Sequence, residues 1–356
     1  MRPLLKPALR RLWRDPATLQ LGLDPRYAVA LAGLGPADSD LLDALDGTRT
    51  TAELIAAGER RGRPAARTAE LLHRLGEAGA IEDAAGSRGP ADPRHEPDLR
   101  SLSLTHPGPG AAHAVLTARA SVCVEIFGAG RIGAGVAMLL AAAGVGRLAL
   151  RDAGPLRPAD LAPGGVRGPG AQQGNRADAL RAALAVRPGR AGTGRHEPAG
   201  TPALAVLAPT GSVVPPEWLQ EVRHRAHLPV TIRETTALIG PLVVPGRTPC
   251  VRCLELARGD RDPVWPVLAA QLVGTPDVVE PCDVALAGAA ASITALHVLA
   301  WLDRGEAAPP PSSGGIVELS LDDLRLRRRT VLAHPGCGCG AAEPSAEPQA
   351  RLVIGT

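Results

Sequence analysis

The sequence predicts an α/β protein with an open, mostly parallel sheet, preceded by a small winged-helix-like α+β domain. Residues 122–152 indicate where the sheet begins. There an apolar run, a glycine-rich turn, an Ala/Leu-rich helical segment and a second apolar run follow one another and end in an acid. Beyond residue 200, strand-like runs continue to alternate with helical segments, which is typical of a Rossmann-like sheet covered on both faces.

Residues 1–83 form the predicted small domain, because short strand-like runs are followed by three helical segments and a closing strand. Asp24-Pro25 is a turn signal between the strand-like runs, and Thr50-Thr-Ala-Glu53 has the capping-box pattern that begins a helix. Gly79 is expected to end the last helix. The expected segments are residues 18–23, 27–31, 38–45, 50–62, 67–78 and 80–82.

Three roles are open to this small domain on its residues alone. A strand edge beside an amphipathic helix captures an extended peptide by strand addition. A folding cap or dimerisation arm is the second role. A DNA-binding role is third, because Arg60, Arg61 and Arg63 are basic but acids are interspersed on the same helices.

Residues 84–114 are rich in Pro, Gly, Asp and Arg without periodicity, and we expect a linker. Residues 115–340 form the predicted Rossmann-like domain, and the Pro/Glu/Ala-rich residues 341–356 are expected to be a mobile tail. After the first βαβ unit, helices are expected at residues 177–185, 216–227 and 284–302, and strands at 203–207, 229–233, 238–244, 316–321 and 324–332.

The turn Gly128-Ala-Gly130-Arg-Ile-Gly133 predicts a nucleotide-shaped pocket. Gly128 permits a tight turn, Gly130 lets the backbone approach a phosphate, and Gly133 lets the helix pack close to the strand. The helix N-terminus offers free N–H groups to an anion. Asp152, which follows the second strand, is expected to reach ribose hydroxyls.

Two cysteine pairs, Cys250-Val-Arg-Cys253 and Cys337-Gly-Cys339, predict a structural zinc site with four sulfur ligands. A redox-active Cys-x-x-Cys is the alternative. His334 lies near the second pair and is expected to be a loop residue. Cys123 falls inside a strand and is expected in the core, whereas the sequence leaves the role of Cys282 open between a nucleophile and a buried thiol.

Composition excludes several functions. The net charge of +3 gives no footprint for nucleic acid. No apolar run reaches the length of a membrane span and the N-terminus lacks the apolar stretch of a signal peptide, so we expect a cytoplasmic protein without membrane contact. Lys6 is the only lysine, which excludes a Walker A loop.

Residues 115–340 resemble the ThiF/MoeB-type adenylyltransferases, the bacterial relatives of ubiquitin-activating enzymes, in the turn, the segment GVGRLALRD and the split cysteine pairs. The resemblance implies a structural zinc ion, and ATP with Mg²⁺ for adenylating the C-terminal carboxylate of a small protein. Asp152 matches the family's ribose-binding acid, and Arg176 falls near its lysine.

Other positions of that family's motifs are changed in this sequence. The second acid falls on Gly154, the asparagine on Asp160, the arginine and glutamine on Pro163 and Gly164, and the metal-binding aspartate within Ala208-Pro-Thr-Gly211. Adenylyl transfer depends almost entirely on charge stabilisation, so these losses favour a body without efficient catalysis.

The N-terminal segment, above all Leu45-Asp-Gly-Thr-Arg-Thr50, resembles the recognition element of leader-peptide-binding proteins in ribosomal peptide biosynthesis. With a ThiF-like body and the ending HPGCGC, nearly the whole chain resembles the partner proteins of YcaO cyclodehydratases that make thiazole/oxazole-modified peptides. This implies that the protein binds the leader of a precursor peptide and presents the core peptide to the YcaO enzyme. A homodimer is the family's tendency.

We therefore expect a peptide-binding scaffold with a degenerate adenylyltransferase body. The leader is expected to add as a strand at Tyr27, Val29 and Leu31 and to pack against the helix that carries Leu71, Leu72 and Leu75. An active ATP-dependent adenylyltransferase is the alternative. A nicotinamide oxidoreductase is a third interpretation, for which the sequence offers no catalytic acids or bases in a substrate domain.

Overall fold

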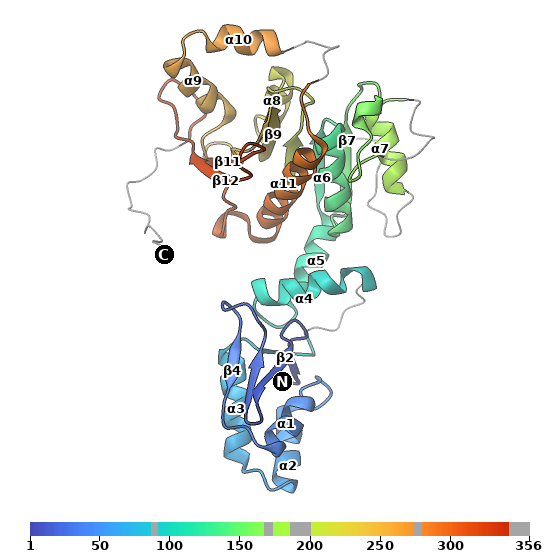
Figure 1. Ribbon diagram of the computed structural model, residues 1–356, viewed down its shortest axis with the longest axis vertical. Coiled ribbons are helices and arrows are strands. Elements are labelled where there is room, and N and C mark those ends of the chain that lie inside the picture. Colours follow the sequence, from blue (N-terminus) through green and yellow to red (C-terminus); the bar gives the residue numbers. More distant parts are fainter. Residues whose placement is uncertain (87–91, 167–173, 186–200, 274–279, 342–356) are drawn as a thin grey trace. The chain divides into compact units, whose positions relative to one another are not determined.

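The computed structural model divides into two compact units, Met1–Ala118 and Arg119–Thr356, which are described one at a time (Figure 1). The structure describes residues 1–86, 92–166, 174–185, 201–273 and 280–341. All but the first residue of the predicted mobile tail, 341–356, lies outside the described residues.

The main sheet of the first unit has three antiparallel strands in the order β2-β3-β4. They are β2 (Arg11–Asp15), β3 (Thr18–Leu21) and β4 (Val29–Leu31). A second pair joins β1 (Pro3–Leu5) to β5 (Ile81–Asp83). The sequence predicted β3, β4 and β5 but missed β1 and β2, which lie before the first recognised turn signal.

Three helices, α1 (Pro36–Asp43), α2 (Thr51–Arg60) and α3 (Ala65–Glu77), follow β4 as predicted. The capping box of α2 is confirmed: the Glu53 N–H donates to Thr50 Oγ1 at 3.2 Å, and the Thr50 N–H donates to Glu53 Oε2 at 2.7 Å. Gly79 has φ +66°, the left-handed conformation expected just beyond a helix end.

The predicted linker, residues 84–114, contains helix where irregular chain is expected from the sequence. Its helices are α4 (Glu96–Thr105) and the first residues of α5 (Ala111–Ser121), and a short 3₁₀ turn, Pro93–His95, precedes α4. Leu104 packs against the core of the first unit, and the buried Lys6 ammonium donates to the carbonyl of Ser103 at 2.7 Å. The only lysine of the chain thus ties α4 to the N-terminal strands, and its burial lowers its pKa.

The second unit is built on a seven-stranded sheet in the order β12-β11-β10-β9-β8-β6-β7. Its strands are β6 (Cys123–Phe127), β7 (Arg147–Arg151), β8 (Leu204–Leu207), β9 (His227–Arg233), β10 (Thr236–Ile239), β11 (Gly315–Ser320) and β12 (Leu326–Thr330). The predicted Rossmann-like open sheet is confirmed. Its β7-β6-β8-β9 half is parallel and its β9-β10-β11-β12 half is antiparallel, because short turns such as the one after Arg233 allow only antiparallel pairing.

Helices accompany the sheet in the order α6 (Arg131–Ala142), α7 (Arg176–Ala185), α8 (Pro216–Val222), α9 (Val251–Arg261), α10 (Trp265–Leu272) and α11 (Val284–Arg304). The helix predicted for residues 216–227 ends at Val222, because the chain turns there and His227 enters β9 as a buried residue. Helices α9 and α10 are not predicted from the sequence.

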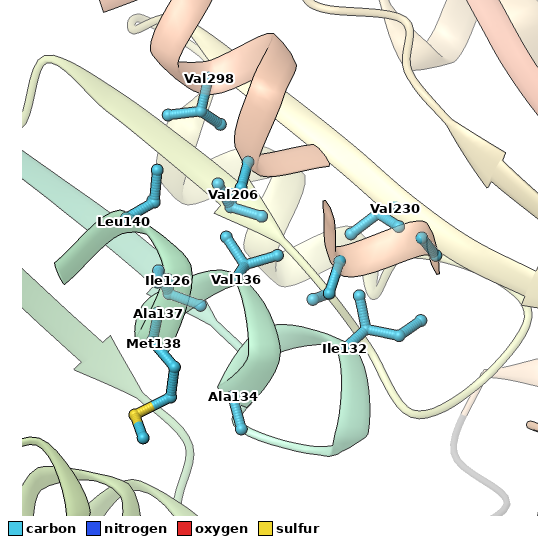
Figure 2. Close-up of a cluster of buried hydrophobic side chains, with 14 of the residues drawn as sticks. Ile126, Ile132, Ala134, Val136, Ala137, Met138, Leu140, Val206, Val230 and Val298 are labelled. Atoms are coloured by element: carbon cyan, nitrogen blue, oxygen red, sulfur yellow. The ribbon is translucent and has the colours of Figure 1, made fainter. Parts of the chain in front are cut away.

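Helices α6 and α11 pack together over one face of this sheet (Figure 1). Figure 2 shows Val136 and Leu140 of α6 pointing toward Val206 of β8 and Val298 of α11, and all four are buried in one cluster. By length and mean hydropathy (1.7) the segment Val284–Ala307 is also able to cross a membrane. The expectation that no apolar segment reaches the length of a membrane span is therefore wrong for this helix. Its buried residues, among them Ala291 and Val298, pack in the core of the second unit with α6.

Small residues set the distance between these helices. A Cβ on Gly135 of α6 would lie 2.8 Å from the Cβ of Ala291 on α11, whereas a Cβ on Gly288 of α11 would meet nothing within 4 Å. The same substitution therefore has opposite consequences at two helical positions. At Gly135 it forces the helices apart, and at Gly288 it only restricts the unfolded chain.

We predict that Gly135→Ala lowers the free energy of unfolding by about 1–3 kcal/mol, whereas Gly288→Ala raises it by about 0.4–1 kcal/mol. Chemical denaturation followed by circular dichroism measures both values. Equal stability of the two variants would contradict the close packing of α6 and α11.

Candidate functional site

The glycine turn between β6 and α6 has the geometry that the sequence predicts. Gly128 has φ +87°, and a Cβ there would lie 2.0 Å from the carbonyl oxygen of Ala208. A Cβ on Gly133 would lie 1.8 Å from the carbonyl oxygen of Gly128. Both positions therefore exclude any side chain, and α6 begins directly at the carboxyl end of β6.

A cavity of about 830 Å³ opens at these carboxyl ends, within the second unit. Ligands of open α/β sheets bind at this edge, which makes the cavity the candidate site. Its wall includes Gly130 and Asp152, as predicted, together with Trp218 of α8 and Ile232 of β9.

Asp152 is held by backbone donors. The N–H groups of Ala129 and Gly154 donate to its two carboxylate oxygens at 2.7 and 2.8 Å. Arg176, the first residue of α7, lies 3.9 Å away through Nη1 but bonds more closely to Asp160, at 2.7 Å from Nε to Oδ2. The structure thus brings the predicted residues Asp152 and Arg176 together and adds Asp160 between them and Gly130.

Acids outnumber arginines among the described residues that line the cavity. They are three arginines and five acids: Asp152, Asp160, Glu217, Glu280 and Asp283. The arginines are engaged within the protein: Arg176 pairs with Asp160, and Arg131 donates to the carbonyl oxygens of Ala159 and Cys282. Polyphosphate sites require an excess of cations or a bound metal ion, and the described side chains provide no excess of cations.

Cys282 lies at the cavity wall and is half-buried. Burial raises the pKa of its thiol, although Arg131 acts in the opposite direction, so the thiol is not activated as a nucleophile. Cys123 is buried in β6, as expected of a core residue.

The four remaining cysteines form one cluster. The Sγ–Sγ distances are 3.9 Å for Cys250–Cys253, 3.6 Å for Cys250–Cys337 and 3.5 Å for Cys253–Cys339, and all four sulfurs lie within 4.8 Å of one another. These separations are too long for disulfides, whose S–S length is about 2.05 Å. Four sulfurs at about 2.3 Å from a tetrahedral zinc ion would stand about 3.8 Å apart, so the donor set fits zinc.

The pKa values of the clustered thiols also favour a bound cation. Burial, with hydrogen bonds to Cys250 and Cys253, raises the pKa of Cys337 to about 12, and burial raises the pKa of Cys250. Burial opposes ionisation of Cys339 as well, but the Ala341 N–H and the neighbouring thiols lower its pKa to about 7. Without a metal the thiols do not ionise together, whereas a bound divalent ion stabilises all four thiolates.

His334 supports the loop that carries Cys337 and Cys339. Its Nε2 lies 2.8 Å from a carboxylate oxygen of Asp260, and its Nδ1 accepts the Gly336 N–H at 3.0 Å. Both ring nitrogens are therefore engaged outside the cysteine cluster, in agreement with the expected loop role.

The predicted peptide-contacting residues of the first unit divide by burial. Leu71, Leu72 and Leu75 of α3 are buried in the core of the unit, which gives them a structural role. Leu31 is also a core residue, at 9 % exposure. Tyr27 and Val29 pack against this core and stay partly exposed, so these two of the predicted residues keep accessible side-chain surface.

Comparisons with known proteins give a match in structure alone. No family model and no curated protein matches the chain. Matching solved structures include E. coli MccB with AMPCPP and MccA, at 14 % identity and TM-score 0.70, covering 96 % of this chain and 100 % of MccB. The microcin C7 biosynthetic enzyme MccB with N-formylated MccA matches at 15 % identity and TM-score 0.70, over 96 % and 100 % of the two chains.

The heterocyclase TruD matches at 16 % identity and TM-score 0.60, over 96 % of this chain and 43 % of TruD. At such identities the likeness establishes the fold. The chain has the Rossmann-like ThiF-type fold.

The sequence assigns no role in the cavity to Arg131 or Trp218, and it points to Asp160 only through the position of the family's asparagine. Arg131 lies inside the glycine motif itself, so its position was a usable signal. Asp160 and Trp218 come from segments about thirty and ninety residues further along the chain, and only the fold brings them to the turn.

We predict about one zinc ion per chain in the purified protein. Cys253→Ser should lose it, because three sulfurs remain and the buried first turn of α9 loses its ligand. Cys282→Ser, a cysteine outside the cluster, should keep it. Inductively coupled plasma mass spectrometry measures the metal content. Full zinc content in the Cys253→Ser protein would contradict the four-sulfur site.

Proposed function

We propose that this protein binds the leader of a precursor peptide through its N-terminal unit, and presents the peptide to a YcaO-type cyclodehydratase. Its ThiF-type body acts as a scaffold with a structural zinc ion. The observation that supports this proposal most strongly is the unpaired edge of β4 in the first unit. The homodimer that the family resemblance implies is part of the proposal.

Strand β4 offers one edge to an incoming chain. Among the described residues β4 pairs with β3 alone, so backbone groups along its other edge have no strand partner. An extended peptide satisfies such groups by adding as a further strand, with backbone hydrogen bonds giving affinity and side-chain contacts giving specificity. Tyr27 and Val29 supply partly exposed apolar surface at this edge.

The opposite edge of the same sheet is less suited to strand addition. Strand β2 exposes the charged residues Arg11, Arg14 and Asp15, and its register shifts between Trp13 and Asp15. Charged side chains and bulges protect sheet edges from pairing with other chains. The two edges therefore differ in the way the proposal requires.

Helix α3 fixes the position of β4. Arg67 in its first turns donates to the Gly33 carbonyl at 3.0 Å and to Asp38 at 2.9 Å. Leu71 and Leu75 share the apolar core with Leu31 of β4. The strand is thus preorganised before a peptide arrives, which reduces the entropy lost on binding.

The structural neighbours support a role in the biosynthesis of modified peptides. MccB, a microcin biosynthetic enzyme solved with MccA, matches this chain over both units, and TruD is a heterocyclase. The described lining of the cavity, with five acids and three arginines, favours a protein that leaves the ATP-dependent step to its enzyme partner.

We predict that the full-length protein binds the precursor peptide encoded beside its gene at micromolar concentration. Val29→Asp and Tyr27→Ala should each weaken binding at least tenfold, because they remove apolar contact at the β4 edge, and Val29→Asp adds a charge there as well. Trp13→Asp, an exposed apolar residue on β2, should leave affinity within twofold. Fluorescence polarisation with labelled peptide measures all four proteins. Equal losses for the β2 and β4 variants would refute the assigned edge.

Adenylation remains the second candidate function, because MccB structures with ATP and AMPCPP match the chain throughout and the glycine turn is intact. The proposed scaffold role predicts no peptide-dependent exchange of labelled pyrophosphate into ATP. Exchange that disappears in the Asp152→Ala protein would instead establish the adenylyltransferase.

A further inference from the structure

The N-terminus of α6 is the strongest anion-attracting feature of the cavity. Gly130 is its N-cap residue, in an extended conformation and without a side chain to cap the helix. The first N–H groups of a helix and its dipole favour a negative charge at this position. In a Rossmann-like fold that charge belongs to a bound phosphate.

In this chain a carboxylate of the protein itself lies beside that position. Asp160 is 6 % exposed, and its Oδ1 lies 3.7 Å from the place where a Cβ on Gly130 would stand. Its Oδ2 accepts the Arg157 N–H at 2.8 Å and Arg176 Nε at 2.7 Å. One buried acid therefore meets the helix terminus and neutralises an arginine of the cavity.

The segment that carries Asp160 is held in place from two sides. It forms a 3₁₀ turn, Pro158–Asp160, that Asp160 caps through the Arg157 N–H. Arg131, the first residue of α6, donates to the Ala159 carbonyl and also to the Cys282 carbonyl at 2.5 Å. The carboxylate is thus preorganised at the helix terminus, and moving it away would break several hydrogen bonds at once.

We propose that Asp160 is a built-in anion that excludes polyphosphates from this cavity. It is a specificity-determining residue for the nucleotide-shaped pocket. A phosphate at Gly130 would stand within a few ångströms of the Asp160 carboxylate in a partly desolvated site, where like charges repel more strongly than in water. The ion pair with Asp160 also occupies Arg176, the cation that would otherwise face the phosphate. Two further acids of the described lining, Glu217 and Glu280, add negative charge to the pocket.

The test looks for a gain of MgATP binding, which a variant with a damaged fold would not show. The full-length protein is titrated with MgATP by isothermal titration calorimetry at fixed ionic strength. Asp160→Asn removes the charge with almost no change of shape, and Asp160→Ser removes it by a second route. Glu217→Gln, an exposed acid at the cavity wall, is the matched control that removes one charge away from Gly130.

The wild-type protein is expected to show no saturable binding up to about 1 mM ATP. At least one Asp160 variant should bind MgATP at least tenfold more tightly than the Glu217→Gln protein. Saturable binding of MgATP by the wild type below about 1 mM overturns the proposal. It is also overturned if neither Asp160 variant reaches the tenfold gain over the control. The peptide-binding role of the first unit is measured separately, so failure of one leaves the other standing.

Discussion

The close approach of α6 to the strands beneath it is the constraint on which the second unit depends. Glycines at 128 and 133 leave no room for a Cβ against the carbonyl oxygens of Ala208 and Gly128, so the turn has one backbone path. The same tight packing continues at Gly135, which faces Ala291 of α11. Because the helix is fixed at both contacts, its N-terminus and the ends of β6, β7 and β8 form one rigid edge, and the cavity lies there.

At this edge of the sheet the backbone resembles a nucleotide site more closely than the side chains do. The backbone features of a nucleotide site, namely the glycine turn, the uncapped helix and Asp152, are all present. The described side chains beside them are acids and arginines engaged within the protein, and the proposed scaffold role rests on this. The backbone geometry of the turn also holds the core together, whereas the side chains that line a cavity differ between proteins of one fold. In the first unit a core of leucines supports β4, a strand at the edge of its sheet.

The sequence predicted the features that local patterns encode. Three such features depend on residue type and spacing: the βαβ unit, the capping box of α2, and the cluster that joins Cys250-Val-Arg-Cys253 to Cys337-Gly-Cys339. The structure has each of them. Helix α4 is not predicted because the Pro and Gly residues around it obscure the short apolar pattern of Leu102 and Leu104. These leucines stabilise the helix only where the core of the first unit and Lys6 lie beside it. An amphipathic stripe such as Leu71, Leu72 and Leu75 does not reveal whether its apolar face meets the core or a ligand. The position of Asp160 at Gly130 required the fold itself.

Hydrogen–deuterium exchange on the full-length protein tests the scaffold role most directly, because it reports on both units in one experiment. The protein is compared alone, with the precursor peptide, and with peptide and MgATP. A scaffold that leaves the ATP-dependent step to a partner should show slower exchange at residues 27–31 with peptide, and no added protection at residues 128–133 with MgATP. Protection confined to residues 128–133, appearing only when MgATP is present, would contradict the scaffold role and assign the protein an ATP-dependent reaction.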